Sequence, residues 1–127
     1  IDHLGITVSN LEKSTAFYVQ ALGALGYVLC NNGPGLASFG VPEGHGKSAD
    51  PGGEFWISEG VPMKPRMHVA FNAASPADVD AFHAAGLAAD GTENGAPGVR
   101  AQYHPGYYAA FVLDPDGYNI EAVCHMD

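Results

Sequence analysis

The stretch DHLGITVSNLEKSTAFY, residues 2–18, predicts a β-strand that runs directly into an α-helix. Residues 9–12, SNLE, match the S-x-x-E capping box, in which serine and glutamate side chains bond backbone N–H groups at a helix start. Apolar residues then recur at helical spacing as far as Leu25, and Gly26 is a stop signal. His3 stands at the start of the strand and is the first candidate for chemistry.

The same strand–helix pattern returns 65 residues later in the chain. His3 aligns with His68, and the helix-ending Gly26 aligns with Gly91. Residues 75–78, SPAD, announce the second helix with a capping serine and a proline at the first helical position. Further matches include Ala16 with Ala81, Phe17 with Phe82 and Leu22 with Leu87. This self-similarity indicates an internal duplication with pseudo-twofold symmetry.

Each half also contains three strand candidates after its helix. In the first half they are GYVLC (26–30), LASFGV (36–41) and the strand in DPGGEFWIS; in the second they are VRAQYH (99–104), YYAAFVL and the strand in DPDGYNIEAV. The order β-α-β-β-β in each half predicts an α+β fold. We expect a single domain over residues 1–127, with module one at about 1–60 and module two at about 66–127.

Composition limits the function classes. The chain has 127 residues, which suits one domain, and a net charge of −9 with five Lys and Arg residues. This charge argues against nucleic acid and anionic membrane surfaces as partners. It also disfavours a substrate with several carboxylates or phosphates clamped by arginines. Two cysteines, no signal peptide and no membrane span favour a cytoplasmic protein with free thiols.

The two strand histidines have small or polar neighbours on their own faces. Because strand side chains alternate, His3 shares a face with Gly5 and Thr7, and His68 shares one with Ala70 and Asn72. Small and polar neighbours leave space around each histidine and are not typical of a packed core face. We expect pseudo-symmetry to bring the two histidines near the axis.

Glu121 is a carboxylate inside the apolar strand YNIEAV. If it is buried it needs a cation or a proton, although an edge position exposed to water is the alternative. A divalent metal would satisfy Glu121, His3 and His68 together. Two histidines and one carboxylate on one side of a metal leave positions open for substrate or water.

Three stretches of the sequence together resemble the vicinal oxygen chelate superfamily: DHLGITVSNLEKSTAFY, MHVAF and AAFVLDPDGYNIEAV. This superfamily contains glyoxalases, fosfomycin- and bleomycin-resistance proteins and extradiol dioxygenases. The resemblance covers essentially the whole chain, and the DPDG-x-x-IE ending is its most specific part. It implies paired βαβββ modules that form a cup-shaped mixed sheet around a divalent metal, which is Fe, Mn, Zn, Ni or Co. By matching position, it makes His3, His68 and Glu121 the metal ligands.

One departure from the family pattern bears on the reaction. Glyoxalase I-type members have a fourth ligand, a glutamate in the last strand of the first module. Here that position is Trp56, or Ile57 if the DP-G turns are aligned, and neither binds metal. The chain therefore resembles the three-ligand members, and glyoxalase I activity is disfavoured.

Further site candidates lie around the predicted cup. His104, Tyr107 and Tyr108 occur at a turn before the Glu121 strand. We expect His104 and Tyr108 to act as catalytic acid–base groups. Tyr107 and Trp56 are expected to bind substrate, and the alternative is that the tyrosines pack the cup rim. His45 lies in a glycine-rich loop, as a lid residue or as an ordinary polar loop residue.

Two functions follow from these features. The first is a metal-dependent dioxygenase, lyase or isomerase for a small oxygen-chelating substrate. The second is a metal-free drug-binding protein like the bleomycin-resistance members, which typically lack the three ligands. A homodimer is expected. The modules pair within one chain or between chains, and in the second case His3 comes from one subunit and His68 with Glu121 from the other.

Overall fold

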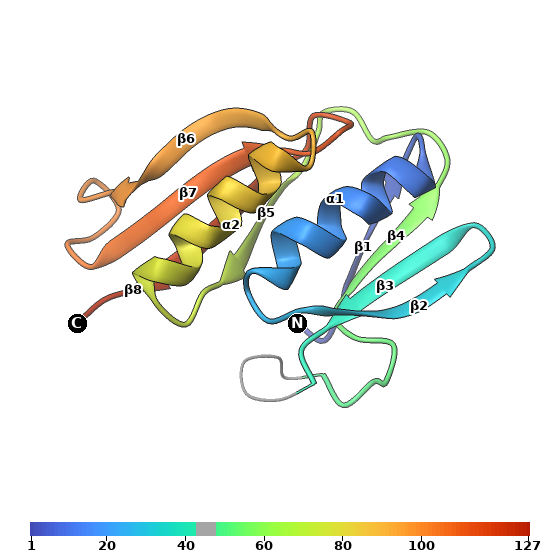
Figure 1. Ribbon diagram of the computed structural model, residues 1–127, viewed down its shortest axis with the longest axis horizontal. Coiled ribbons are helices and arrows are strands. Elements are labelled where there is room, and N and C mark those ends of the chain that lie inside the picture. The colour runs from blue at the N-terminus through green and yellow to red at the C-terminus, as the bar shows by residue number, and fades with distance from the viewer. Residues whose placement is uncertain (43–47) are drawn as a thin grey trace.

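The computed structural model describes residues 1–42 and 48–127 (Figure 1). Each half contains a strand, a helix and three further strands, which confirms the α+β class. The first half consists of β1 (Leu4–Val8), α1 (Leu11–Gly23), β2 (Val28–Gly33), β3 (Leu36–Gly40) and β4 (Phe55–Glu59). The second consists of β5 (His68–Asn72), α2 (Pro76–Ala88), β6 (Thr92–Val99), β7 (Tyr107–Leu113) and β8 (Asn119–His125).

Each half forms its own four-stranded mixed sheet. The strand orders are β1-β4-β3-β2 and β5-β8-β7-β6. In both sheets the first strand pairs parallel with the last, and the other pairs are antiparallel. The identical order agrees with the duplication inferred from the sequence. It also leaves β1 and β5 as edge strands.

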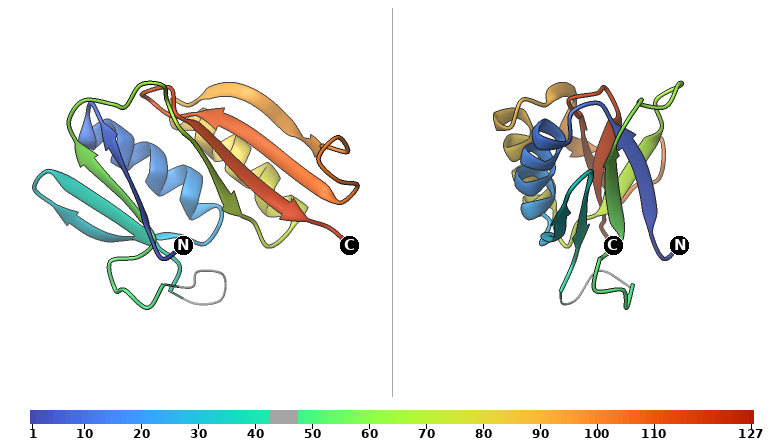
Figure 2. Two further views of the ribbon diagram at one scale, coloured as in Figure 1. Left: turned by 180° about the vertical axis from the view of Figure 1, so that it is seen from behind. Right: turned by 90° about the vertical axis from the view of Figure 1, so that its right-hand side faces the viewer.

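The two helices lie side by side and cover one face of both sheets, while the other face stays open (Figure 2). The alternation of buried and exposed residues follows from this layering, because every second strand residue faces a helix. In β1, Ile6 and Val8 are buried and Gly5 is exposed. The side chains with the deepest burial include Phe17, Phe39, Phe55, Phe82, Val112 and Ile120.

The modules are joined by buried polar and aromatic contacts. The Tyr18 hydroxyl of α1 donates to Oδ2 of Asp114 at 2.6 Å, and both residues are buried. The Tyr118 hydroxyl donates to the carbonyl of Thr7 at 2.7 Å. Phe55 and Phe71 meet edge to face with centroids 5.2 Å apart. These contacts hold the two sheets in a fixed relation to each other.

The helix starts agree only in part with the sequence prediction. Ser75 caps α2 as expected, and its hydroxyl accepts from the Asp78 N–H at 3.2 Å. The cap of α1 is Asn10, whose side chain accepts from the Lys13 N–H, so the capping-box prediction for Ser9 was wrong. Ser9 instead donates its backbone N–H and its hydroxyl to Asp116 of the other module. For Ser9, hydrogen bonds to the Asp116 carboxylate, which tertiary folding brings close, therefore replace the expected local capping interaction.

Two strand predictions were also displaced. VRAQYH was expected to be a strand over 99–104, but β6 ends at Val99 and a turn follows. β6 forms from the glycine-rich segment TENGAPGV because β7 offers it an antiparallel partner, with two register shifts. Similarly, β2 extends beyond the predicted strand over 26–30, because residues 31–33 also pair with β3.

No helix in the described residues is long and apolar enough to cross a membrane. Cys30 and Cys124 are both free thiols.

Candidate metal and substrate site

The open face of the second sheet brings His68 and Glu121 together. They lie on the parallel neighbours β5 and β8, where Ala70 is the register partner of Glu121. The Nε2 atom of His68 and Oε1 of Glu121 are 2.8 Å apart. His68 is about half exposed, whereas Glu121 is 2% exposed. Of the two alternatives left open by the sequence, Glu121 is therefore the buried carboxylate and not an exposed edge residue.

The tautomer of His68 follows from its second contact. Its Nδ1 atom lies 2.8 Å from the carbonyl oxygen of Asn119, which can only accept. Nδ1 therefore carries a hydrogen, and Nε2 is the ring nitrogen that faces Glu121, where the 2.8 Å contact is a hydrogen bond when a proton lies between the two atoms. A histidine held this way, with Nδ1–H on a backbone carbonyl, has the arrangement typical of metal-ligating histidines.

Tyr107 is the second partner of Glu121, because its hydroxyl donates to Oε2 of the carboxylate. To reach it, the side chain extends along the sheet past the Ala109–Val123 pair, whose residues are small or buried. Desolvation, followed by the bond to Glu121, raises the pKa of Tyr107 to about 12. The phenol is therefore a neutral donor at ordinary pH.

Tyr108 lies on the opposite face of the sheet, since neighbouring strand residues alternate. Its hydroxyl donates to Oδ1 of Asp80 on α2 at 2.7 Å, and this bond raises the pKa of Tyr108. The structure therefore brings Tyr107, and not Tyr108, to the carboxylate. The catalytic role expected for Tyr108 has no contact with Glu121 to support it.

His104 and His125 form a pair beside Tyr107. The Gly106 N–H donates to Nδ1 of His104, so the hydrogen of the neutral ring is on Nε2 and points to Nδ1 of His125 at 2.9 Å. The ring of Tyr107 stands edge-on to both imidazoles, with centroids 5.4 and 5.3 Å away. The sequence interpretation missed His125. The period-two spacing from Glu121 would have placed it on the same face.

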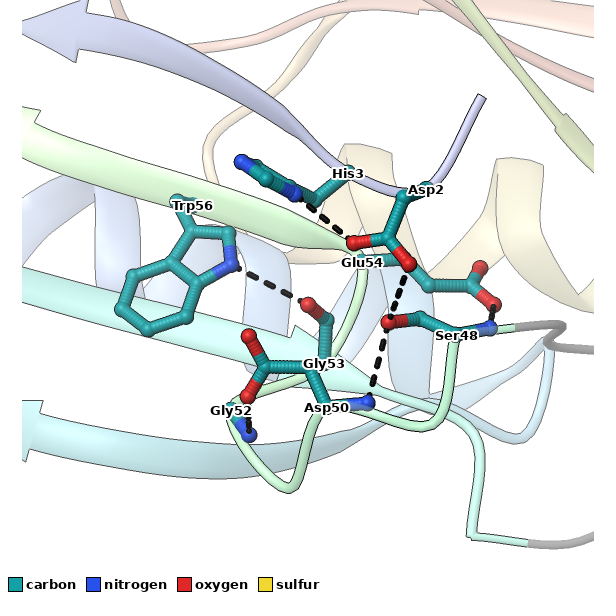
Figure 3. A network of polar contacts seen from close by, with 8 residues as sticks. All are labelled: Asp2, His3, Ser48, Asp50, Gly52, Gly53, Glu54 and Trp56. Carbon is teal, nitrogen blue, oxygen red and sulfur yellow. Dashed lines mark hydrogen bonds and ion pairs between the residues drawn. The ribbon is translucent and has the colours of Figure 1, made fainter.

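His3 lies directly before β1, in a separate polar network (Figure 3). Its Nδ1 atom is 2.8 Å from Oδ1 of Asp2, and the Ser48 hydroxyl donates to Oδ2 of Asp2 at 3.2 Å. The indole N–H of Trp56 donates to the carbonyl of Gly53 at 3.0 Å in the same region. A cavity of about 270 Å³ lies next to His3 and is also lined by Tyr27, Glu54 and residues 69–72 of β5.

The three predicted metal ligands do not meet within one chain. Figure 2 (left) shows β1 and β5 running in opposite directions, so the histidines at their starts lie at opposite ends. His3 accordingly shares its cavity with the end of β5, without His68. In the part of the chain that the structure describes, no three His, Cys, Asp or Glu residues form a group that could hold a metal ion. The expectation that both histidines lie near the axis fails for this reason. His45 is outside the described residues.

Strand register shows which residue of the first sheet is equivalent to Glu121. Trp56 of β4 pairs with Gly5 of β1, and Glu121 of β8 pairs with Ala70 of β5. The two pairs occupy equivalent positions in the two sheets, so Trp56, and not Ile57, corresponds to Glu121. Trp56 is half-buried on the open face.

The comparisons with known proteins agree with this fold. The sequence model of the Glyoxalase/Bleomycin resistance protein/Dioxygenase superfamily matches residues 1–122. A glyoxalase/bleomycin resistance protein from Albidiferax ferrireducens T118 is 31% identical with a TM-score of 0.79, over 99% of this chain and 98% of that chain. A glyoxalase/bleomycin resistance protein/dioxygenase family enzyme from Burkholderia phytofirmans PsJN has the same fold at 15% identity, with a TM-score of 0.72 over 98% of both chains. A search of curated proteins finds no match.

Proposed function

This chain belongs to the Glyoxalase/Bleomycin resistance protein/Dioxygenase superfamily, and from that premise we propose that it is a metal-dependent enzyme for a small substrate with two neighbouring oxygen atoms. The metal is a divalent ion, Fe, Mn, Zn, Ni or Co, and its ligands are His68, Glu121 and His3. The observation that carries the proposal is the orientation of His68, whose Nδ1 is occupied by Asn119 while Nε2 faces a buried carboxylate. Imidazole and carboxylate together suit these metals.

The third ligand comes from a second copy of the chain. His3 and His68 lie at opposite ends of two edge strands in one chain, so a complete ligand set requires another arrangement of modules. In a homodimer in which β1 of one copy lies beside β5 of the other, His3 of one copy can face His68 and Glu121 of the second. Edge strands carry unpaired backbone groups, which favours such an association.

Such a metal supplies Lewis-acid polarisation of a substrate oxygen or, if it is iron, activation of dioxygen. The chain's own residues orient the site. Tyr107 holds Oε2 of Glu121, and Asn119 holds the ring of His68. Trp56 and Phe111 provide aromatic walls for a substrate on the open faces. His104 is the acid–base candidate, because its Nε2 proton is shared with His125 next to Tyr107.

The reaction class follows from the ligand that is absent. Trp56 occupies the position equivalent to Glu121, so the first sheet contributes no carboxylate at that position. A three-ligand site leaves more positions open to substrate or dioxygen. We therefore favour a dioxygenase, lyase or isomerase over glyoxalase I.

A second candidate function is metal-free binding of a small molecule or drug in the manner of the bleomycin-resistance proteins. One observation favours it: both oxygens of Glu121 already have partners within the chain, His68 and Tyr107. The buried carboxylate therefore does not require a metal for its own stability.

The decisive experiment is metal analysis of the purified protein by elemental analysis and titration calorimetry. We expect one divalent ion per chain, lost in His68→Ala and in His3→Ala but retained in His83→Ala. His83 is a suitable control because it pairs with Glu93, away from the site. A wild-type protein that binds no divalent metal, yet folds normally, contradicts the enzyme and leaves the binding protein.

Mixing two inactive chains tests the intersubunit site. A dimer of His3→Ala chains has no intact site, and a dimer of His68→Ala chains has none either. A mixed dimer has one intact site, formed by His3 of the second chain with His68 and Glu121 of the first. We expect metal binding to return after the two chains are unfolded and refolded together. If it does not return, the ligands are not shared between chains.

A further inference from the structure

Arg100 is held rigidly on the second sheet by its own strand. Its Nη2 donates to the carbonyl of Ala96 at 2.6 Å and its Nη1 to the carbonyl of Gly98 at 2.9 Å. A guanidinium has five N–H donors in a planar fork, so several donors remain available after these two bonds. The group is preorganised, which reduces the entropy lost when it binds a ligand.

Two glycines make room for this arrangement. A Cβ atom added to Gly98 would lie 3.2 Å from Nη1 of Arg100. One added to Gly95 would lie 2.7 Å from Cδ2 of Phe111 and 3.3 Å from Nη2 of Arg100. Larger residues at either position would displace the guanidinium or the ring beside it. The glycine-rich sequence of β6 thus builds a cradle for Arg100.

The cradle places the guanidinium beside Phe111, the aromatic ring that also stacks on the candidate metal ligand His68. The Cζ atom of Arg100 lies 5.4 Å from the ring centroid of Phe111. The ring of Phe111 in turn lies 6.1 Å from that of His68, at an interplanar angle of 30°. Phe111 is also the register partner of Glu121. A cation, an aromatic surface and an imidazole therefore follow one another across the sheet.

The charge distribution makes this cation unusual. Residues 68–127 contain no other Lys or Arg, in a protein of net charge −9. The ion pairs among the described residues all involve histidine, so no carboxylate in that part of the chain forms an ion pair with Arg100. A negatively charged ligand is repelled by most of the surface, and Arg100 is the group on this sheet that can attract one.

We propose that Arg100 and Phe111 form a carboxylate-binding subsite for a small, planar, singly charged acid beside His68 and Glu121. The guanidinium fork takes the carboxylate, and the flat body of the acid lies along the edge of the Phe111 ring, since Arg100 lies over the ring and His68 stacks on it. This inference rests on the proposed function. It specifies the substrate as a monocarboxylate whose two neighbouring oxygen atoms lie at the end of the molecule opposite the carboxylate. Because the subsite has one cation, we expect it to accept one carboxylate and not two.

The test uses benzoate and its neutral analogue benzamide on the full chain, in the presence of a chelator so that no metal takes part. Backbone amide NMR shifts report where each compound binds. We expect saturable shifts at residues 98–100 and 111 with benzoate, with a Kd in the millimolar range that is usual for such a small ligand, and much weaker shifts with benzamide. Arg100→Gln is expected to weaken benzoate binding roughly tenfold or more, and Arg100→Lys less.

Arg66→Gln is the matched control. Arg66 is also held by two carbonyls, those of Met63 and Asp116, and its Cζ lies 5.7 Å from the ring centroid of Tyr118. This variant changes the net charge by the same amount and is expected to bind benzoate like the wild type. Equal binding of benzoate and benzamide to the wild type, or shifts confined to other elements, overturns the proposal even if Arg100→Gln fails to fold. Metal binding is measured separately, so the failure of either proposal is recognisable.

Discussion

The two open faces of the molecule have the same frame and different contents. Gly5 pairs with Trp56 in the first sheet as Ala70 pairs with Glu121 in the second. One position has an indole bonded to the Gly53 carbonyl, and the other has a buried carboxylate with two partners. Duplication therefore determines where a side chain lies, while the residue at that place decides its chemistry. The second face holds most of the candidate site, and the first supplies His3 and a wall.

The largest effect is expected where the two halves are most alike. Phe17 and Phe82 occupy equivalent helix positions and are both completely buried. Truncation of either to alanine removes apolar burial and leaves a cavity, at a cost of about 3–5 kcal/mol of unfolding free energy. Urea denaturation should give similar losses for the two variants. A loss confined to one of them would show that the helices do not share the core equally.

The next effect separates the two faces. Glu121→Gln should weaken divalent metal binding by about 100-fold or more, because a neutral amide replaces a ligand carboxylate. Glu59→Gln on the first sheet should leave binding unchanged, since Glu59 bonds the Leu11 N–H at a helix start. Competition with a chelating dye measures both affinities. Equal losses in the two variants would contradict the placement of the site.

Converting one face toward the other sharpens the comparison. Trp56→Glu places a carboxylate at the position equivalent to Glu121 and is expected to tighten metal binding about tenfold if a fourth ligand is gained. The variant should also lose about 1–3 kcal/mol of stability, because a half-buried indole and its bond to Gly53 disappear. Calorimetry and urea denaturation measure these effects. Unchanged metal affinity in a folded variant would show that the first sheet does not face the metal.

A subtler contrast concerns two adjacent tyrosines. Tyr107→Phe removes the donor to Oε2 of Glu121 and should weaken metal binding about tenfold, whereas Tyr108→Phe, on the other face, should not change it. The same calorimetric titration compares the two. A loss in Tyr108→Phe alone would restore the role that the sequence suggested for that residue.

The smallest effect is on alkaline stability. The folded pKa of Tyr107 is about 12 and its unfolded value is 10.0. The folded state therefore retains this proton over a range in which the unfolded state has lost it. The contribution of Tyr107 to stability is complete below pH 10 and declines as the pH rises through 12. Wild-type stability should fall more steeply in this range than that of Tyr107→Phe, as measured by urea midpoints. Parallel curves would contradict the raised pKa.

Sequence periodicity predicted much of the second face. The alternation in HVAFN put His68, Ala70 and Asn72 on one side, and all three are exposed there. The apolar flanks of Glu121 correctly indicated its burial. The same reasoning could have separated Tyr107 from Tyr108 if the strand register had been known. It could not find Arg100, because a residue after a glycine-rich strand has no periodic signal.

The sequence by itself determined the α+β class, the duplicated strand–helix order and the open side of β1 and β5. These depend on local spacing and on repeated residues, which are readable along the chain. Only the tertiary structure decided that Asn10 caps α1, that residues 92–99 form a strand, and that His3 lies far from His68. Each of these depends on a partner from a distant segment: Asp116 for Ser9, β7 for β6, and the antiparallel approach of β5 to β1 for the two histidines.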